Sequence, residues 1–184
     1  MMKDILVIHP ADPTTDCLCT IYGGREDCDI IRDPSTDAET IAKAIEDHGK
    51  ILCLGHGTPE GLLAYDKGFR FGRFIVNTLH KAYFENKQVW SIWCNSDQYF
   101  KDVHTSTRGI HTGMIISEFI EEKLIMGKAP LTVLEMNENM KVFSEAFRDN
   151  FSFENPDESR ENILSMYTFK DEITEYNRNH ILVF

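Results

Sequence analysis

The sequence has no long hydrophobic run and little positive charge. Its 184 residues include 19 Lys and Arg against 30 Asp and Glu, a formal net charge of −11 at pH 7. Such an acidic chain offers no basic surface to nucleic acid or to an anionic membrane, so we expect neither as a partner. The apolar run near the N-terminus, residues 5–8, is too short for the core of a signal peptide, and no stretch approaches the length of a membrane span. We therefore expect a cytoplasmic protein.

Cysteine is scarce and odd in number, with five residues in the chain. An odd count in a protein expected to be cytoplasmic argues against a disulfide framework. One combination offers potential metal ligands, but its spacing, C-x-C-x8-C with an upstream histidine, matches no common zinc module. Its members are His9, Cys17, Cys19 and Cys28. We expect separate free thiols, no bound metal and no cofactor.

The usual phosphate-binding patterns are also missing. Gly23 and Gly24 follow a weak strand pattern but lack the spacing of a dinucleotide-binding turn or a P-loop. A phosphatase loop of the form Cys-x5-Arg would need arginine six places after Cys94, where the chain has Phe100. We therefore expect neither a nucleotide site nor a phosphatase loop.

Strand and helix patterns alternate from residue 5 to residue 126. Apolar or β-branched runs predict strands at 5–8, 18–22, 29–31, 51–54, 89–93 and 181–184, and a hairpin over 62–71. Helical periodicity predicts helices at 36–48, 74–84, 114–126, 131–147 and 161–167, with a loop over 95–109. Thr36 and Glu39 predict a capping box for the first helix. This alternation predicts an α/β fold, a three-layer α/β/α sandwich with a mostly parallel central sheet, formed as a single domain over residues 1–184.

Two chemically capable residues each follow a predicted buried strand. His56 lies between two glycines just after the run 51–54, and Cys94 closes the run 89–93. In mostly parallel sheets, ligands bind at the carboxyl ends of the strands. If these two strands are neighbours, His56 and Cys94 reach the same edge of the sheet.

A cysteine and a histidine at one edge contain the minimum parts of a cysteine hydrolase. The nucleophile is the thiolate, and a nearby histidine can take the thiol proton and later protonate a leaving amine. Gly57 leaves its backbone N–H open to a substrate carbonyl, and the N–H of Cys94 would be the second donor of an oxyanion hole. Simpler readings stay open: the glycines form a tight turn, and Cys94 is a small buried hydrophobic residue.

The segments ILCLGHG and VWSIWC resemble the two motifs of the caspase-like cysteine peptidases, the group of caspases, gingipains, legumain, separase and CHAT domains. HGTPEGLLAYDKG and GIHTGMIISEFIEEKL extend the resemblance over roughly residues 5–124. The resemblance implies a caspase-like fold, with Cys94 as nucleophile, His56 as general acid/base and Gly57 with Cys94 as oxyanion hole. It implies no third residue that orients the histidine. Trp93 departs from the family, whose members often carry a small residue there, and we expect its indole to narrow the approach to the thiol.

The resemblance implies a cysteine endopeptidase acting on a peptide or protein substrate. Asp97 and Glu60 lie near the two motifs, and we expect them to favour cleavage after Arg or Lys, although Asp97 also fits a loop residue bonded to its own backbone. The alternatives are a catalytically inactive caspase-like module that binds a partner protein and a hydrolase acting on a non-peptide amide. Strand 181–184 offers an edge for a partner or for a homodimer.

Overall fold

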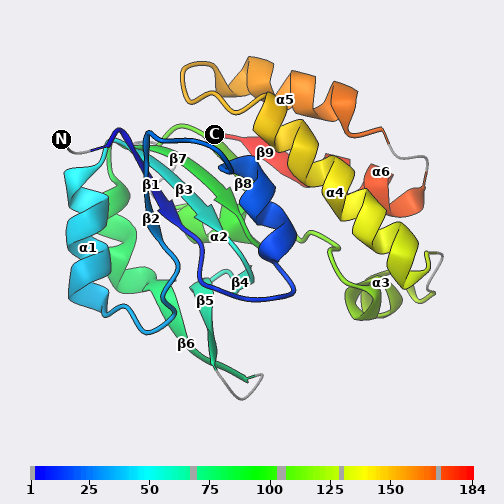
Figure 1. Ribbon diagram of the computed structural model, residues 1–184, viewed down its shortest axis with the longest axis horizontal. Helices are drawn as coiled ribbons and strands as arrows, with labels where there is room; N and C mark the ends of the chain where they lie inside the picture. The colour runs from blue at the N-terminus through cyan, green and yellow to red at the C-terminus, as the bar shows by residue number, and fades with distance from the viewer. Residues whose placement is uncertain (1–2, 67–69, 103–106, 129–130, 169–170) are drawn as a thin grey trace.

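A six-stranded sheet forms the centre of the protein (Figure 1). The structure is a computed structural model that describes residues 3–66, 70–102, 107–128, 131–168 and 171–184. The strand order is β2-β1-β3-β7-β8-β9, with β9 antiparallel to β8 and the other pairs parallel. The strands are β1 (Ile5–Ile8), β2 (Cys28–Ile31), β3 (Lys50–Leu54), β7 (Gln88–Ile92), β8 (Ile110–Thr112) and β9 (Ile181–Val183). The predicted α/β fold with a mostly parallel central sheet is confirmed.

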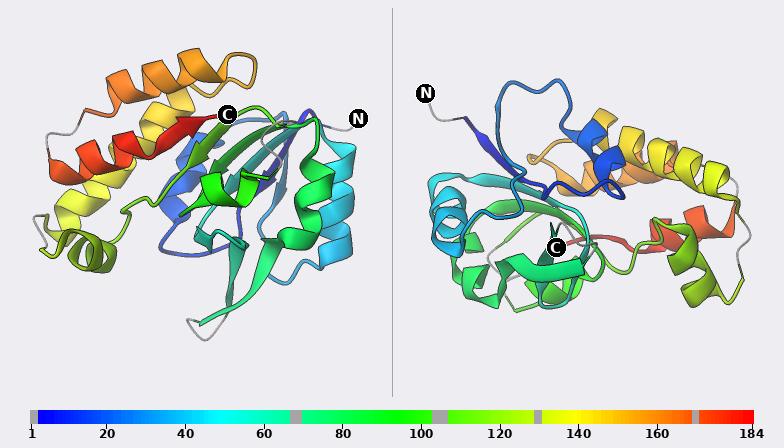
Figure 2. Two further views of the ribbon diagram at one scale, coloured as in Figure 1. Left: turned by 180° about the vertical axis from the view of Figure 1, so that it is seen from behind. Right: turned by 60° about the horizontal axis from the view of Figure 1, so that its bottom comes forward.

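Helices cover both faces of this sheet (Figures 1 and 2). One face carries the 3-10 helix η1 (Asp16–Ile21) with α4 (Val133–Asp149), α5 (Pro156–Met166) and α6 (Glu172–Asn179). The other face carries α1 (Ala38–Asp47), the 3-10 helix η2 (Thr78–Phe84) and the short helix α2 (Ser96–Phe100). Helix α3 (Phe119–Met126) lies at the side of the α4 layer. Among the described residues, no helix is both long and apolar enough to span a membrane.

Consecutive residues of the inner strands enter opposite cores. On β7 and just after it, Trp90 and Ile92 belong to the core beneath α4, whereas Val89 and Trp93 belong to the core beneath α1. Side chains alternate between the faces of a strand, and a strand covered on both faces is apolar throughout. This explains why β1, β3 and β7 are mostly apolar on both faces rather than alternating between apolar and polar residues.

A second, three-stranded antiparallel sheet follows β3 directly. It consists of β4 (Gly57–Thr58), β5 (Gly61–Asp66) and β6 (Arg70–Asn77), and the β5–β6 hairpin projects from the body of the protein (Figure 1). The predicted hairpin is confirmed, although its predicted turn lies outside the described residues. The predicted helix 74–84 is wrong in its first part, because residues 74–77 continue β6 and only 78–84 turn into η2.

Other boundaries differ from the sequence predictions for local reasons. Residues 18–22 lie largely in η1 and not in a strand. Helix α1 begins at Ala38 because Asp37, not Thr36, is its N-cap and accepts a hydrogen bond from the Thr40 N–H at 2.9 Å. The predicted loop 95–109 contains α2.

The structure contains two elements in its C-terminal half that the sequence did not predict, β8 and α6. Residues 114–118 precede α3 rather than belonging to it, and β8 lies just before them. Helix α6 was not predicted, while α4, α5 and β9 match predicted elements with boundaries shifted by a few residues.

A close backbone approach between β7 and β8 gives a first prediction. A Cβ on Gly109 would lie 1.7 Å from the Val89 carbonyl oxygen, so this position accepts no side chain. We expect Gly109→Ala to lower the free energy of unfolding by about 1–3 kcal/mol, the usual cost of overpacking. Gly49→Ala, where a Cβ meets nothing within 4 Å, is the matched control. Urea unfolding checks both, and equal stability of the two variants would contradict the prediction.

Candidate active site

His56 and Cys94 lie at the same edge of the central sheet. β3 and β7 are parallel neighbours, with Leu54 opposite Ile92, and each candidate residue follows its strand by two positions. The turn after β3 is tied to β7 by a hydrogen bond from the Gly55 N–H to the Ile92 carbonyl oxygen at 3.2 Å. The condition set by the sequence, that the two strands be neighbours, is therefore met.

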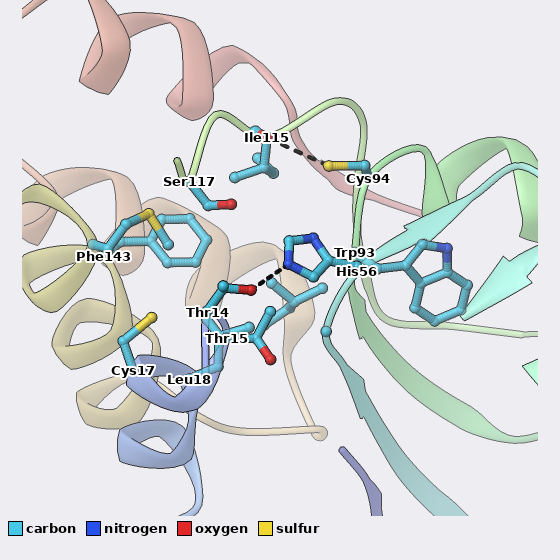
Figure 3. Close-up of a pocket in the computed structure, with 13 residues that line it drawn as sticks. Thr14, Thr15, Cys17, Leu18, His56, Trp93, Cys94, Ile115, Ser117 and Phe143 are labelled. Carbon is cyan, nitrogen blue, oxygen red and sulfur yellow. Dashed lines mark hydrogen bonds between the residues drawn. The ribbon is translucent and has the colours of Figure 1, made fainter. Parts of the chain in front are cut away.

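Both residues line one small pocket between the sheet edge, η1 and α4 (Figure 3). Its volume is about 20 Å³, roughly the space of a single water molecule. The lining residues are Thr14, Thr15, Cys17, Leu18, Gly55, His56, Ile92, Trp93, Cys94, Ile115, Ser117, Met140 and Phe143. At this volume the pocket is too small to hold a substrate side chain.

Two neighbouring segments hold the His56 imidazole. Its Nε2 lies 2.7 Å from the Thr14 hydroxyl and 3.1 Å from a Glu118 carboxylate oxygen, with Asp12 at 3.7 Å. The Thr14 hydroxyl donates to Asp12 at 2.9 Å, so it accepts the Nε2–H of His56. The histidine therefore has orienting partners, which the family resemblance did not imply.

These carboxylates determine the charge of His56. Burial alone would lower its pKa, but the hydrogen bond and charge of Glu118, followed by the charge of Asp12, raise the pKa above its ordinary value. The same hydrogen bond lowers the pKa of Glu118. Both shifts favour an imidazolium–carboxylate pair.

The Cys94 thiol is held in its protonated form. Its Sγ donates to the Ile115 carbonyl oxygen at 3.3 Å, as Figure 3 shows. Burial, and then the charges of Glu121 and Glu118, raise the pKa of the Cys94 thiol to about 12. At neutral pH this geometry therefore corresponds to a resting thiol and not to an activated thiolate.

Gly57 has a packing role that the sequence did not reveal. A Cβ at this position would lie 2.0 Å from Cδ1 of Trp93, so the glycine lets β4 pass over the indole. The expectation that Trp93 narrows the approach to the thiol is wrong. Its indole is 2% exposed, packs against Tyr99 and Phe100 of α2, and points away from His56 (Figure 3). The oxyanion-hole role of Gly57 and Cys94 stays a prediction.

The two predicted substrate-binding carboxylates lie elsewhere. Neither Asp97 nor Glu60 is among the residues that line the pocket. Asp97 is in the first turn of α2, where its Oδ1 is buried with no hydrogen-bond partner among the described residues. Glu60 is exposed in the β4–β5 turn and accepts a hydrogen bond from the Thr58 hydroxyl at 2.5 Å.

The sequence analysis did not identify the acidic residues that surround the site, which are Asp12, Glu118 and Glu121. Asp12 and Thr14 follow β1, which is the other neighbour of β3, so their loop reaches the same edge. Glu118 and Glu121 form the capping box of α3. The pattern Asp12-x-Thr14 after an apolar strand was the available signal, but its meaning depends on the strand order.

The cysteines and His9 do not form a metal centre among the described residues. Cys19 Sγ lies 3.8 Å from Nδ1 of His9, in a cluster with Tyr22 and Arg32, and Cys28 is buried on β2. No group of three or more potential ligands occurs in the described part of the chain.

Comparison with models of known protein families and with curated protein sequences gives no match. The functional proposal for this chain therefore depends on the geometry around His56 and Cys94. That geometry combines a thiol, an imidazole and three nearby carboxylates at one sheet edge.

The Glu118 contact gives a second prediction. Glu118→Gln should lower the pKa of His56, followed by NMR titration of its imidazole, because the variant loses the carboxylate charge. A raised histidine pKa contributes stability that is complete below the unfolded value of 6.5 and is lost as pH rises through the folded pKa. The wild type should therefore exceed the variant by about 0.5–1 kcal/mol near pH 6, with the difference shrinking above the folded pKa. Glu60→Gln is the control, and an unchanged His56 titration in Glu118→Gln would contradict the assignment.

Proposed function

We propose that this chain is a cysteine hydrolase that cleaves peptide bonds with Cys94 as nucleophile and His56 as general acid/base. The observation that carries the proposal is the position of both residues at the carboxyl ends of the adjacent parallel strands β3 and β7, lining one pocket. Acyl transfer requires a thiol and an imidazole together, which is the combination found at this edge.

The proposed reaction follows the order of proton transfers that such a pair permits. His56 takes the Cys94 proton, and the thiolate attacks the carbonyl carbon of the peptide bond. The backbone N–H groups of Gly57 and Cys94 would stabilise the oxyanion. The imidazolium then protonates the leaving amine, and a water activated by His56 hydrolyses the thioester and restores the thiol.

We further propose that the fold is caspase-like. The sequence pattern has three parts. The buried strand followed by His-Gly corresponds to β3, the hairpin to β5–β6 and the later strand followed by Cys to β7. β7 lies directly beside β3, which supports a caspase-like fold, because the pattern requires the His-Gly motif and the Cys motif at the same edge of the sheet.

A preference for Arg or Lys before the cleaved bond stays a prediction, but we now assign it to different carboxylates. None of the pocket-lining residues is acidic, so the carboxylates that could attract a basic side chain are those next to His56, namely Asp12 and Glu118. Asp97 and Glu60 are less suitable, since neither lines the pocket.

The alternative function is a caspase-like module that binds a partner protein without catalysis. The protonated, buried thiol and the small closed pocket favour it. The edge strand β9 is the proposed pairing surface for a partner or a second copy, although Arg160 already donates to the Ile181 carbonyl oxygen at 2.6 Å.

Cleavage of a fluorogenic peptide library, varied at the residue before the bond, tests the enzyme. We expect His56→Ala to lower the rate by about 10²–10⁴-fold and Cys94→Ser to abolish it, since these changes remove the proton acceptor and the nucleophile. Cys17→Ser is the matched control, because Cys17 lines the same pocket without a role in the reaction. Cleavage that survives in Cys94→Ser would refute the assignment. An inactive wild type that no cysteine-directed acyloxymethyl ketone labels would favour the binding module.

A further inference from the structure

One short stretch of chain contacts both members of the Cys–His pair. We call residues 115–118, between β8 and α3, the covering segment. Its Ile115 carbonyl oxygen accepts a hydrogen bond from the Cys94 thiol, and its Glu118 carboxylate shares the His56 Nε2–H with the Thr14 hydroxyl. The side chains of Ile115 and Ser117 also line the pocket (Figure 3). Three of these four residues thus form a hydrogen bond with the thiol, contact the imidazole or line the pocket.

A buried asparagine of α6 fixes the middle of the covering segment. Asn177 is fully buried, and its Oδ1 accepts the Ile116 N–H at 2.8 Å while its Nδ2 donates to the Ile116 carbonyl oxygen at 2.8 Å. Both backbone groups of Ile116 are satisfied by this one side chain. An asparagine amide used in this way sets the position of the segment, because a shift would leave buried polar groups without partners.

A glutamate of α3 fixes the end of the covering segment. Glu121 Oε2 accepts hydrogen bonds from the Ser117 N–H at 2.9 Å, the Ser117 hydroxyl at 3.0 Å and the Glu118 N–H at 3.1 Å. Charged acceptors make strong hydrogen bonds, so this carboxylate holds Glu118 against His56. Its charge also opposes ionisation of Cys94.

The held state has one proton too many for attack. With His56 as imidazolium and Cys94 as thiol, both ring nitrogens carry a proton, so neither has a lone pair that could accept the thiol proton. Attack needs either a neutral imidazole or a thiolate. Burial by the segment and the charges of Glu118 and Glu121 disfavour the thiolate, while Glu118 disfavours the neutral imidazole.

We propose that the covering segment holds the Cys–His pair at rest, that Asn177 and Glu121 are the positioning residues that keep it closed, and that the thiol becomes reactive when the segment moves away. This inference deepens the proposed function, because it concerns the regulation of the same site. Movement of residues 115–118 would separate Ile115 from Cys94, separate Glu118 from His56 and open the pocket in one step.

The reactivity of Cys94 tests the inference without any substrate. The alkylation rate by iodoacetamide is measured from pH 6 to pH 10 by peptide mass mapping, in the wild type, Glu118→Gln and Asn177→Ala. We expect both variants to react at least about ten-fold faster at pH 7.5, the change that a one-unit fall in thiol pKa produces. The two act differently: Glu118→Gln removes a charge and leaves the Ile116 bonds intact, whereas Asn177→Ala frees the segment.

Matched controls separate movement of the segment from general loosening. Ser159 is a buried polar residue of α5 that donates to the Ser152 carbonyl oxygen rather than to the covering segment, so Ser159→Ala should leave the Cys94 rate unchanged. Glu60→Gln removes an exposed charge and should also have no effect. Cys53, fully buried in β3, reports unfolding in the same digest. If alkylation of Cys53 accelerates as much as alkylation of Cys94 in the variants, the inference is overturned.

The outcomes also distinguish this inference from the proposed function. If Cys94 of Glu118→Gln and of Asn177→Ala is alkylated at the wild-type rate at every pH, the inference is overturned. Faster alkylation with no peptide cleaved by any variant supports a closed segment but refutes the peptidase. Cleavage by the wild type at the same rate as by both variants supports the peptidase and refutes the closed segment.

Discussion

Parallel pairing between β3 and β7 places Leu54 opposite Ile92, and the two strands therefore end at the same edge. His56 and Cys94 reach the same pocket only because of this register. β1 on the other side of β3 adds the loop of Asp12 and Thr14 to the same edge. The sheet thus concentrates side chains from separate parts of the chain at one place, as parallel sheets do at their carboxyl ends.

Side chains alternate between the two faces of the sheet along β7, so the neighbours Trp93 and Cys94 enter different environments. Trp93 enters the core beneath α1 and supports β4 through Gly57, while Cys94 faces the pocket beneath η1 and α4. The bulky Trp93 directly before Cys94 therefore does not cover the thiol, because the two side chains leave the strand in opposite directions. The packing of Trp93 also explains why position 57 must be glycine, independently of any oxyanion.

Negative charge is the dominant electrostatic feature of the site. Glu118, Asp12 and Glu121 stabilise a protonated His56, and Glu121 and Glu118 also disfavour the thiolate of Cys94. An active form needs a different arrangement of at least one of them. The covering segment carries Glu118 and is fixed by Glu121, which makes residues 115–118 the part of the chain where a small movement has the largest chemical effect.

The sequence by itself determined the apolar strands, the α/β class and the position of His56 and Cys94 just after two strands, because buried strands and their ends leave local patterns. It misjudged residues 74–77, where a β-rich run adjoins a 3-10 helix, and it could not identify the partners of His56. Thr14 and His56 are separated by 42 positions, and Ile116 and Asn177 by 61. Such contacts depend on strand order and helix packing, which no local pattern encodes. Only the tertiary structure therefore decided that the pair is surrounded by carboxylates and held closed by residues 115–118.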